Sequence, residues 1–570
     1  MKQFVTSLML CLLLISFIGS QATESIGDTL VVGGLGSGDE PLNVVIEGDT
    51  TATGERVHSV YRLKRDGWYE LSGTMNSPDF ALTVVAEAGE GRRPVLLMGL
   101  NESGAAAGWQ FLNAGGDVMF KDIRIQQIHS ALDARSPWGH AFMFSNGPGA
   151  RIVFDNCIID FNDGAFIMNE GAGPSNQVYK FTDCMWRWNG HWDGGAWNGF
   201  GPLLKNNKQD SVIYENCTWT GGIAPIFTFE TGEIGYFKMN HCTIVDHMQF
   251  LMRYEFWTNA EITNNLFINA HVAGENEVQA AGQGFDGLPY GVITVDSIPT
   301  DSAFMTFPPE ADRRMIVKNN CNFVDPDIKD WWGQAETDYA DQGWMYADWT
   351  QYNGFLNSRA LGMFNDNETW PMLELENLWT EDPGFADYPD NSDILIQWGK
   401  AYQDTAEARP EDFNADPDGN VLQPTDVDVY DLSYSNETYL TGATDGFPMG
   451  DLNWFPDKKA QWEAWLTGVE TEKAETLPVN FELAQNFPNP FNPSTTIEYT
   501  MLNKGQVDLA VYNLIGQKVK TLVDDVQLAG RYTVQWNGMN EQNQPVSSGV
   551  YIYKITTAFN TQCKKMMLVR

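Results

Sequence analysis

The hydrophobic and polar positions of the chain repeat most clearly between residues 120 and 267. Each copy of the repeat is an apolar residue, two polar residues and then Cys, Asn or Ile. The six copies begin at Phe120, Phe154, Phe181, Tyr214, Met239 and Ile262, at intervals of 34, 27, 33, 25 and 23 residues. Alternating apolar and polar residues predict a strand, and a strand that recurs at such intervals predicts a solenoid. We therefore expect an all-β fold in which one such strand per turn stacks into a parallel β-helix.

The fourth residue of each copy predicts one file of side chains inside this solenoid. The file contains Ile123, Cys157, Cys184, Cys217, Cys242 and Asn265. Strands of neighbouring coils lie only about 4.8 Å apart, so adjacent cysteines would come near bonding distance. We expect buried free thiols, with a disulfide between coils as the alternative. Residues 317–323, which contain Cys321, look like one more coil that is displaced by one residue.

The segments on either side of the repeat have different patterns. Apolar runs precede it at 42–46, 60–63, 68–71 and 81–85. They predict an N-terminal cap and first coils over 23–100, which protect the sheet edge of a core at 101–325. Over 326–469 the repeat fades and Trp, Asp and Pro dominate, which predicts irregular loops and short helices at the C-terminal end. The glutamate-rich residues 470–476 predict a linker.

The last 94 residues, 477–570, predict a separate small β-sandwich. Short alternating runs occur at 507–512, 532–536, 550–555 and 564–569, and they are punctuated by Gly516, Gly530, Gly538 and Gly549. Short strands with glycine-containing turns are typical of an immunoglobulin-like fold.

This segment resembles the C-terminal sorting domain, type A, of proteins exported by type IX secretion. Four motifs carry the resemblance in order: NFPNPFNPSTTI, YNLIGQKVKTLV, SSGVYIYKI and KKMMLVR. The motif residues are Asn486, Pro488, Asn489, Pro490, Asn492, Pro493, Gly516, Gly549, Lys564 and Lys565. The resemblance implies that the type IX machinery is a partner, and that the protein crosses the outer membrane of a Gram-negative bacterium to be secreted or attached to its surface. An ordinary immunoglobulin-like accessory module is the alternative.

The solenoid in turn resembles the right-handed parallel β-helices of pectin-lyase-like cargo proteins. Its opening, residues 29–100, resembles that of cargo whose function is not established, so this resemblance supports the fold and no particular activity.

Residues 1–22 have the pattern of a secretory signal peptide. Lys2 is followed by an apolar run from Leu8 to Ile18 and by small residues up to Ala22. The run is too short to span a bilayer, and no later stretch approaches the roughly 20 apolar residues that a transmembrane helix needs. We therefore expect an exported chain without a transmembrane segment.

The charge of the chain is concentrated outside the last 94 residues. Residues 477–570 carry 8 of the 35 Lys and Arg and 6 of the 75 Asp and Glu, which leaves 27 basic and 69 acidic side chains, or −42, on the rest. Such acidity argues against binding to nucleic acid or to anionic membranes, because both need basic patches. It is compatible with Ca²⁺ sites built from carboxylates, and with simple solubility.

One stretch distantly resembles a pectate lyase. Ile244-Val245-Asp246-His247 stands where that family has Trp-Ile-Asp-His, and Arg253 follows soon after. Elimination from a uronate needs a cation, usually Ca²⁺ on a carboxylate, and a basic side chain that removes the proton at C5. The resemblance implies Asp246 as a Ca²⁺ ligand and Arg253 as the base. The chain lacks the family's Trp and its later Arg-x-Pro-x-x-Arg, so an ordinary turn after a strand is the alternative.

Other chemistries lack their motifs in this sequence. The Asp-Asp dipeptide of β-helical polygalacturonases occurs only at Asp524-Asp525, in the predicted sandwich, so hydrolysis is less favoured than elimination. The chain contains no Gly-rich phosphate loop, no His-Glu-x-x-His and no Gly-x-Ser-x-Gly.

An aromatic loop after one ladder strand is the best candidate for a binding surface. The candidate residues are Trp188, His191, Trp192, Asp193 and, from a later coil, His247. Indole faces stack on sugars while neighbouring polar groups hydrogen-bond hydroxyls. Aromatic cover for the side of the solenoid is the alternative, and it is favoured for Trp186. Two functions therefore stay open: a surface β-helix that binds extracellular glycan or mediates adhesion, which we favour, and a Ca²⁺-dependent polysaccharide lyase.

Overall fold

The chain divides into two compact units, residues 1–463 and 464–570, and each is described by itself. The computed structural model describes residues 24–26, 28–34, 40–77, 80–102, 107–108, 110–129, 141–145, 147–160, 162, 164–169, 173–189, 201–205, 207–223, 225–230, 232–253, 256–276, 290–296, 298, 309–338, 344–345, 350–403, 430–467, 482–501, 505–513, 517–527, 530–542, 544–557 and 561–569. The expected signal peptide at 1–22 and linker at 470–476 lie outside these residues.

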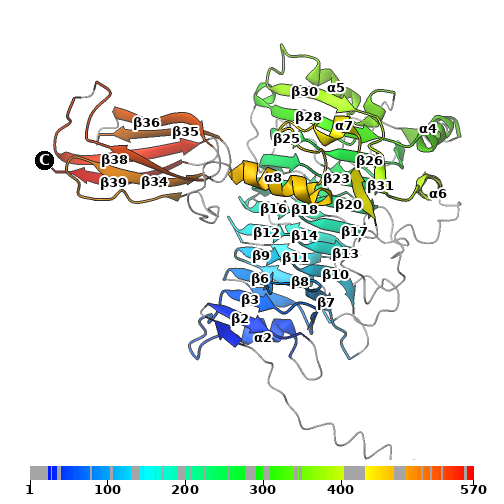
Figure 1. Cartoon of the computed structure of the whole chain (residues 1–570), viewed down its shortest axis with the longest axis horizontal. Helices are drawn as coiled ribbons and strands as arrows, with labels where there is room; N and C mark the ends of the chain where they lie inside the picture. The colour runs from blue at the N-terminus through cyan, green and yellow to red at the C-terminus, as the bar shows by residue number, and fades with distance from the viewer. Residues whose placement is uncertain are drawn as a thin grey trace, which may run out of the picture. The chain divides into compact units, whose positions relative to one another are not determined.

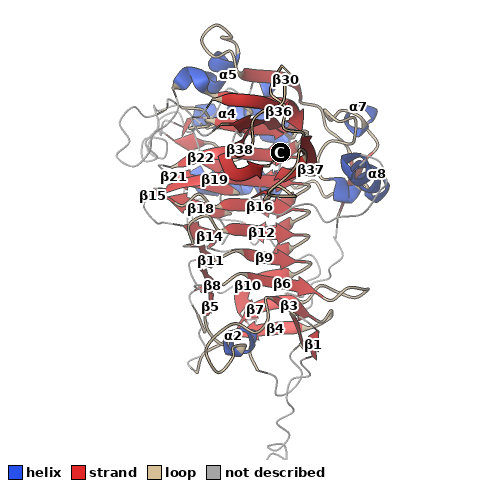
Figure 2. Cartoon of the chain, turned by 90° about the vertical axis from the view of Figure 1, so that its left-hand side faces the viewer, coloured by secondary structure: helices blue, strands red, loops and turns tan. Residues whose placement is uncertain are grey.

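The first unit is a parallel β-helix with three faces, which confirms the expected fold class. Successive coils stack strand on strand (Figures 1 and 2). The first face contains β2 (Thr29–Val32), β3 (Val60–Leu63), β6 (Leu82–Ala86), β9 (Val118–Lys121), β12 (Arg151–Asp155), β16 (Val178–Thr182), β19 (Asn207–Glu215), β22 (Glu233–Asn240), β25 (Asn259–Thr263), β28 (Arg314–Phe323) and β30 (Leu373–Trp379). The second contains β4 (Trp68–Leu71), β7 (Val95–Met98), β10 (Arg124–His129), β13 (Ile158–Asp160), β17 (Met185–Asn189), β20 (Thr218–Gly222), β23 (Thr243–His247) and β26 (Leu266–Ala270), with the end of β28. The third contains β5 (Met75–Ser77), β8 (Gln110–Ala114), β11 (Ala141–Ser145), β14 (Ala165–Asn169), β18 (Pro202–Lys205), β21 (Phe227–Glu230) and β24 (Met252–Arg253).

A single residue in left-handed conformation turns the chain from the first face to the second. Eight coils have such a residue within the described part of the chain, with φ between 48° and 63°: Asp122, Asn156, Asp183, Asn216, His241, Asn264, Asn319 and Asn377. Among non-glycine residues, Asn, Asp and His are enriched at positive φ. The third residue of each sequence repeat is therefore polar because the backbone there is left-handed. We call these eight residues the turn ladder.

The predicted interior file is confirmed. Its six members, Ile123, Cys157, Cys184, Cys217, Cys242 and Asn265, are at most 1% exposed. The cysteines are free thiols, as expected. The Cys184 Sγ donates to the carbonyl oxygen of Phe154 in the preceding coil at 3.4 Å, and burial raises the pKa of this thiol well above its usual value. These cysteines are therefore packing residues that also bond between coils.

The prediction that 317–323 is one more coil is confirmed, but its expected displacement by one residue is wrong. Val317 pairs with Ile262 and Lys318 pairs with Thr263, so Asn320 stacks directly on Asn265. The Asn265 amide donates to Oδ1 of Asn320 at 2.9 Å. Cys321 is one position further along and faces outward, where it packs under the C-terminal segment of this unit. The repeat was misread because Asn replaces Cys in the file.

Aromatic side chains stack in the core above one another. Phe120, Phe154, Phe181 and Tyr214 form a continuous stack with ring centroids 5.0 to 5.4 Å apart. Trp186, expected to cover the side of the solenoid, instead lies inside it and stacks on Trp219 at 4.5 Å. Its alternation with Cys184, two residues earlier, places it on the same inward side of the strand.

The N-terminal end is closed partly by a helix. Residues 42–46, one of the predicted apolar runs, belong to the helix α2 (Leu42–Gly48). Leu42 and Ile46 are buried, and their spacing of four residues is the helical period. Strand β1 (Glu24–Ile26) pairs antiparallel with β2 beside it.

The C-terminal part of the first unit mixes helices with short strands. Its helical elements are η1 (Glu310–Asp312), α4 (Pro326–Asp338), η3 (Tyr352–Gly354), α5 (Ser358–Phe364), α6 (Ser392–Gln403), α7 (Glu437–Leu440), η4 (Leu452–Trp454) and α8 (Pro456–Thr467), whose last residues pass into the second unit. Its strand pairs are β27 (Glu275–Asn276) with β29 (Trp344–Met345) and β31 (Phe385–Asp387) with β32 (Asp431–Tyr434), and β15 (Gly173–Pro174) pairs with β19. None of the described helices has the length and apolar character that a membrane crossing requires.

The second unit is an immunoglobulin-like β-sandwich, as expected. One sheet contains β33 (Glu482–Leu483), β34 (Thr495–Met501) and β37 (Gly530–Trp536), and the other contains β36 (Lys518–Gln527), β35 (Gly505–Tyr512), β38 (Gly549–Thr557) and β39 (Thr561–Leu568). Residues of both sheets, including Ile497 and Tyr553, share one apolar core.

We predict that alkylation distinguishes the file cysteines from the exposed one. Iodoacetamide should label Cys563 in the native protein, whereas Cys157, Cys184, Cys217, Cys242 and Cys321 are buried and should react only in denaturant. Peptide mapping by mass spectrometry reads this out. Native labelling of a file cysteine, or a disulfide-linked peptide from two of them, would contradict the structure.

Candidate functional site

The predicted aromatic loop begins at the end of β17. Trp188 is in this strand, which pairs with β20 through Arg187 and Thr220 and again through Asn189 and Gly222. The side chain of Trp188 and all of His191, Trp192 and Asp193 lie outside the described residues. Their role in binding stays a prediction.

His247 lies at the end of β23 and faces inward. Its Nδ1 is 3.3 Å from the carbonyl oxygen of Gly222, and its Nε2 has no hydrogen-bond partner among the described residues. Burial, with a contribution from His271, lowers its pKa to about 3, so the ring is neutral at physiological pH. It lines a cavity of about 10 Å³ with Trp186 and Thr220. A space of this size holds about one water molecule, not a sugar.

Asp246 is buried and ties a distant segment to the second face. Its carboxylate accepts hydrogen bonds from Asn269 Nδ2 at 2.9 Å, Tyr388 Oη at 2.7 Å and Asn391 Nδ2 at 2.7 Å. Burial raises its pKa. The described part of the chain contains no group of three or more His, Cys, Asp or Glu side chains that could hold a metal ion. The visible role of Asp246 is to anchor residues 388–391.

Arg253 is on a different face from Asp246 and His247. It belongs to β24 and pairs with Thr228 of β21 on the third face, whereas Asp246 and His247 end a strand of the second face. Its side chain is not among those described. The described backbone thus divides the three residues of the predicted lyase between two faces.

A charged triad lies on the outward side of the second face, next to the start of the aromatic loop. Asp160 accepts hydrogen bonds from Arg124 Nε at 2.7 Å, Arg187 Nε at 2.8 Å and Arg187 Nη2 at 2.9 Å. The three side chains come from β10, β13 and β17, which are consecutive strands of this face. All three are at least 97% buried.

The triad carries a net charge of +1 within a chain of net charge −40. Burial would raise the pKa of Asp160, but the two guanidinium groups outweigh burial and hold this pKa below its usual value. The carboxylate is therefore ionised, and its bonds fix both arginines. Sequence reasoning missed the triad, although one signal was available: Asp160 and Arg187 each stand three residues after a file cysteine, and so face outward on adjacent strands.

The last part of the first unit binds the turn ladder rung by rung. We call residues 442–463 the strap. The contacts begin at the C-terminal end of the solenoid. Asn319 donates to the carbonyl oxygen of Gly442, and the next rung, Asn264, forms hydrogen bonds with Thr444 and Gly450. His241 then bonds Asp445, the carbonyl oxygen of Asn216 accepts from Asn453, and Asp183 forms an ion pair with Lys459. Five consecutive rungs are thus engaged by one segment that is remote in sequence.

The strap approaches the second face closely. Gly450 has φ of 75°, and a Cβ there would lie 2.5 Å from Thr243 Oγ1 and 2.9 Å from Leu266 Cδ1. Its N–H donates to the carbonyl oxygen of Asn264 at 2.7 Å. Only glycine fits this position without displacing its neighbours.

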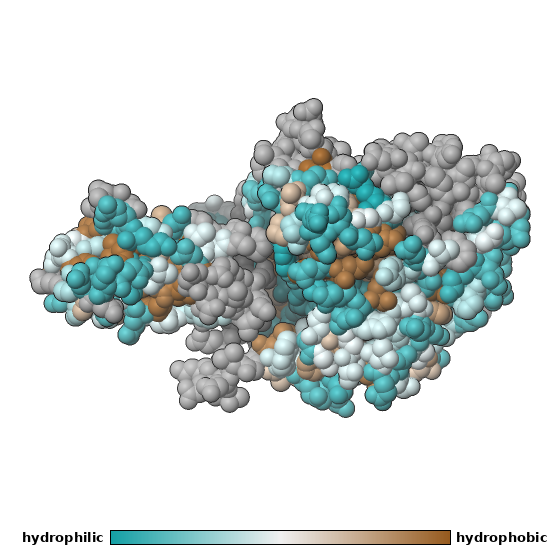
Figure 3. All heavy atoms as spheres, turned by 90° about the horizontal axis from the view of Figure 1, so that it is seen from above, coloured by the Kyte–Doolittle hydropathy of each residue, from teal (hydrophilic) through white to brown (hydrophobic). Residues whose placement is uncertain are grey.

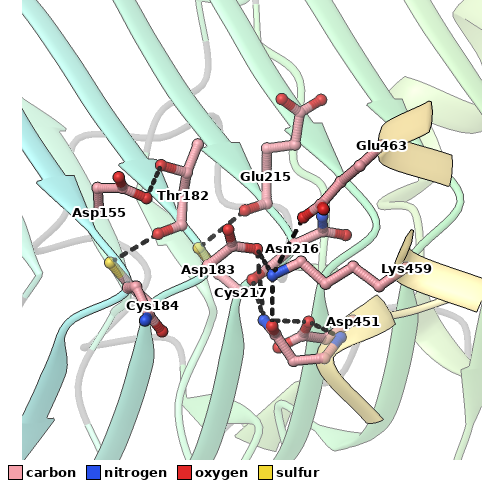
Figure 4. Close-up of polar contacts among 12 residues, drawn as sticks. Asp155, Thr182, Asp183, Cys184, Glu215, Asn216, Cys217, Asp451, Lys459 and Glu463 are labelled. Atoms are coloured by element: carbon pink, nitrogen blue, oxygen red, sulfur yellow. Dashed lines mark hydrogen bonds and ion pairs between the residues drawn. The ribbon is translucent and has the colours of Figure 1, made fainter. Parts of the chain in front are cut away.

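A polar cluster fastens the end of the strap (Figure 4). Lys459 reaches from α8 and lies 2.8 Å from Asp183 Oδ1, while Thr218 donates to Asp451 Oδ2 at 2.7 Å. Burial raises the pKa of Asp451 to about 7 and also raises the pKa of Asp183. Asp451 therefore titrates near neutral pH while it is docked.

Asn486, a residue of the predicted sorting motif, connects the two sheets of the second unit. Asn486 is buried, and its Nδ2 donates to Thr495 Oγ1 at 2.9 Å while its N–H donates to Tyr553 Oη at 2.9 Å. Asn489 Oδ1 accepts from the N–H of Met567 in β39 at 2.9 Å. Asn486 and Asn489 therefore have structural bonds within this unit. Gly516 lies outside the described residues.

We predict that Asp160→Asn is strongly destabilising. Loss of the carboxylate leaves two buried guanidinium groups without a counter-charge, so the free energy of unfolding should fall by about 3–5 kcal/mol. Urea denaturation followed by tryptophan fluorescence measures this change. Glu376→Gln, which removes an exposed pair with Lys318, is the control and should cost less than about 1 kcal/mol. Equal effects of the two substitutions would contradict the assigned role of the triad.

We predict that the strap loosens as the pH rises from 6 to 8. The pKa of docked Asp451 is raised to about 7, whereas the carboxyl of the open strap is ionised throughout this range. Below about pH 7, opening of the strap therefore releases a proton, and a rise in pH favours opening for that reason. Opening should increase about tenfold over these two pH units. The rate of cleavage after Lys458 or Lys459 by a lysine-specific protease measures opening.

Asp451→Asn is the matched control, because an uncharged side chain keeps the bonds to Thr218 and Asn453 without titrating. The ratio of wild-type to variant cleavage at each pH removes the protease's own pH dependence. A ratio that does not change between pH 6 and 8 would show that Asp451 does not govern the strap.

Comparisons with known proteins relate only part of the chain to a family. The model of the FlgD Ig-like domain matches residues 494–560, which lie in the second unit. No curated protein matches the chain. Five solved chains match, and one comes from work on PorZ, described as an essential bacterial surface component of the type-IX secretion system of Porphyromonas gingivalis. The chain is 18% identical to it over 15% of its own length, with a TM-score of 0.12, and spans 11% of the length of that chain.

Proposed function

We propose that this chain is an exported protein of the Gram-negative cell surface that binds extracellular glycan, or another cell through its glycans, without catalysis. The two units divide this task. The second unit directs export, and the first presents a long rigid surface to the ligand.

Export through the type IX machinery is supported by the second unit. Its match to an Ig-like domain agrees with the sandwich, and its four motifs are those on which the resemblance to a sorting domain rests. Asn486 and Asn489 hold the motif against β34 and β39, so the motif is presented on a folded domain. The predicted signal peptide supports the same route.

Glycan binding is supported above all by the aromatic segment that follows the charged triad along the chain. Arg187 is fixed by Asp160, and the next residue, Trp188, opens the segment that contains His191, Trp192 and Asp193. Indole faces stack on sugar rings and neighbouring polar side chains bond the ring hydroxyls, and this segment contains both kinds of residue. The composition of the segment, which begins next to a strand that the buried triad fixes, carries the proposal.

No observation favours the lyase. Asp246 is saturated by three neutral donors, His247 faces a cavity the size of one water molecule, and the backbone of Arg253 is on another face. A Ca²⁺ site at Asp246 would have to displace the bonds that anchor residues 388–391.

We predict that Trp188→Ala reduces binding to glycan about tenfold or more, because it removes a stacking surface. Purified protein is applied to an array of neutral and acidic glycans, and the strongest ligands are then titrated. Trp465→Ala, which changes an exposed tryptophan of α8, is the control and should bind normally.

The same preparation tests the alternative. It is incubated with polygalacturonate and with alginate in the presence of Ca²⁺, and absorbance reports unsaturated products. Product formation that Arg253→Ala abolishes would replace the binding proposal with the lyase. Absence of retention on any glycan would remove the proposal altogether.

A further inference from the structure

A groove lies at the C-terminal end of the solenoid, far along the chain from the aromatic loop. It has a volume of about 320 Å³ and is formed by η3 and α5. Its lining contains Gln351, Tyr352, Leu356, Ser358, Leu361, Gly362 and Asn365. This volume is at the lower end of the range of about 300–1,000 Å³ found for small-ligand pockets.

The backbone at the edge of this groove is strained. Tyr352, Asn353 and Gly354 have φ of 52°, 52° and 73°, so three consecutive residues form one left-handed turn. This conformation is unfavourable for Tyr352 and Asn353, because each carries a Cβ that crowds the following carbonyl oxygen. Strain of this kind persists only where the surroundings impose it, and it is concentrated at binding and catalytic sites.

Buried amides impose the strained turn. Asn322, at the end of β28, donates to the carbonyl oxygens of Tyr352 at 2.8 Å and Asn353 at 3.0 Å. Asn353 donates in return to the carbonyl oxygen of Asn322 at 2.8 Å. Both side chains are at least 92% buried. The solenoid's last coils therefore hold Tyr352 in place through three hydrogen bonds to its turn.

This turn leaves the aromatic side chain of Tyr352 exposed beside a groove lined by both apolar and polar residues. Tyr352 is 39% exposed. Leu356 and Leu361 supply apolar lining, and Gln351, Ser358 and Asn365 supply amides and a hydroxyl. Figure 3 looks onto the end of the solenoid that carries α5 and β30 in Figure 1, and hydrophobic side chains gather there among hydrophilic ones.

The described lining contains no carboxylate, ammonium, guanidinium or imidazole group. A charged ligand would find no counter-charge in it, and an anionic one would also meet the negative field of this unit. An aromatic face with amide and hydroxyl groups around it matches a ring that has apolar faces and a rim of hydroxyls.

We propose that this groove binds a neutral sugar ring, stacked on Tyr352 and hydrogen-bonded by Gln351, Ser358 and Asn365. The inference rests on the proposed function, glycan binding, and adds to it a second site and a ligand class. A protein with one site at β17 and another on its terminal coils can hold one long glycan at two points, or two chains at once.

Titration calorimetry of the full chain tests this proposal with defined probes. Cellohexaose and laminarihexaose are the neutral ligands, and hexagalacturonate is the acidic one. Tyr352→Ala should weaken binding of the preferred neutral ligand about tenfold, and Tyr352→Phe, which keeps the stacking face, should stay within about threefold of wild type.

A pair of glycine substitutions tests the groove without removing a contact. Gly362 lines the groove, and a Cβ there meets nothing within 4 Å, so Gly362→Leu should fill the space and abolish binding while the helix stays folded. Gly333→Leu, at an equally open glycine of α4, is the matched control and should bind as wild type. Equal circular dichroism spectra of the two variants confirm that both are folded.

Each outcome decides between the two proposals. Neutral binding that survives Tyr352→Ala and Gly362→Leu overturns the groove site, and glycan binding stands if Trp188→Ala weakens it. If the chain binds hexagalacturonate and neither neutral ligand, the groove site is likewise overturned, and glycan binding stands if Trp188→Ala weakens it. Failure of the wild-type chain to bind any of the three probes overturns the groove site, and a blank glycan array in addition overturns the proposed function.

Discussion

The left-handed turn between the first and second faces is the constraint on which the first unit depends. Each rung of the turn ladder takes the chain from the first face to the second with one residue, so that the strands before and after it stay in register with the coil below. A polar side chain suits this backbone, and the same side chain then remains available for bonding. The ladder therefore sets both the stacking of the coils and the chemistry of one edge of the solenoid.

The strap uses this chemistry. A carbonyl, a hydroxyl, a carboxylate, a side-chain amide and an amine follow one another along residues 442–463, and they meet Asn, Asn, His, Asn and Asp in the ladder. Below the strap the second face is apolar, with Val245, Leu266 and Ile268 packed against Tyr439 and Met449. Nearer the N-terminus the same face carries Arg124, Asp160 and Arg187 instead. One face thus changes from a covered apolar surface to a charged one, and the aromatic loop begins where that change occurs.

The sequence pattern was sufficient for the fold and for the interior file, because both depend on local alternation and on a repeated interval. It also identified the sandwich of the second unit from its short strands and glycines. It was not sufficient for contacts that join distant segments. The bonds of Asp183 to Lys459 and of Asn322 to Asn353 have no local signature, and the short apolar run at 42–46 predicted a cap without showing that it is the helix α2. The catalytic reading of Asp246 and His247 came from four letters of sequence, whereas the bonds of Asp246 to Tyr388 and Asn391 come from the fold.

Native-state hydrogen exchange at increasing urea concentration tests most directly whether the strap and the coils form one cooperative structure. The amides of Thr444, Gly450 and Asp451 donate to groups of β23 and of the turn ladder. The account predicts that they exchange with the same free energy of opening as the amides of β20, β23 and β26. Exchange of the strap amides orders of magnitude faster than the strands, at every urea concentration, would show that residues 442–463 are a detached tail and would contradict it.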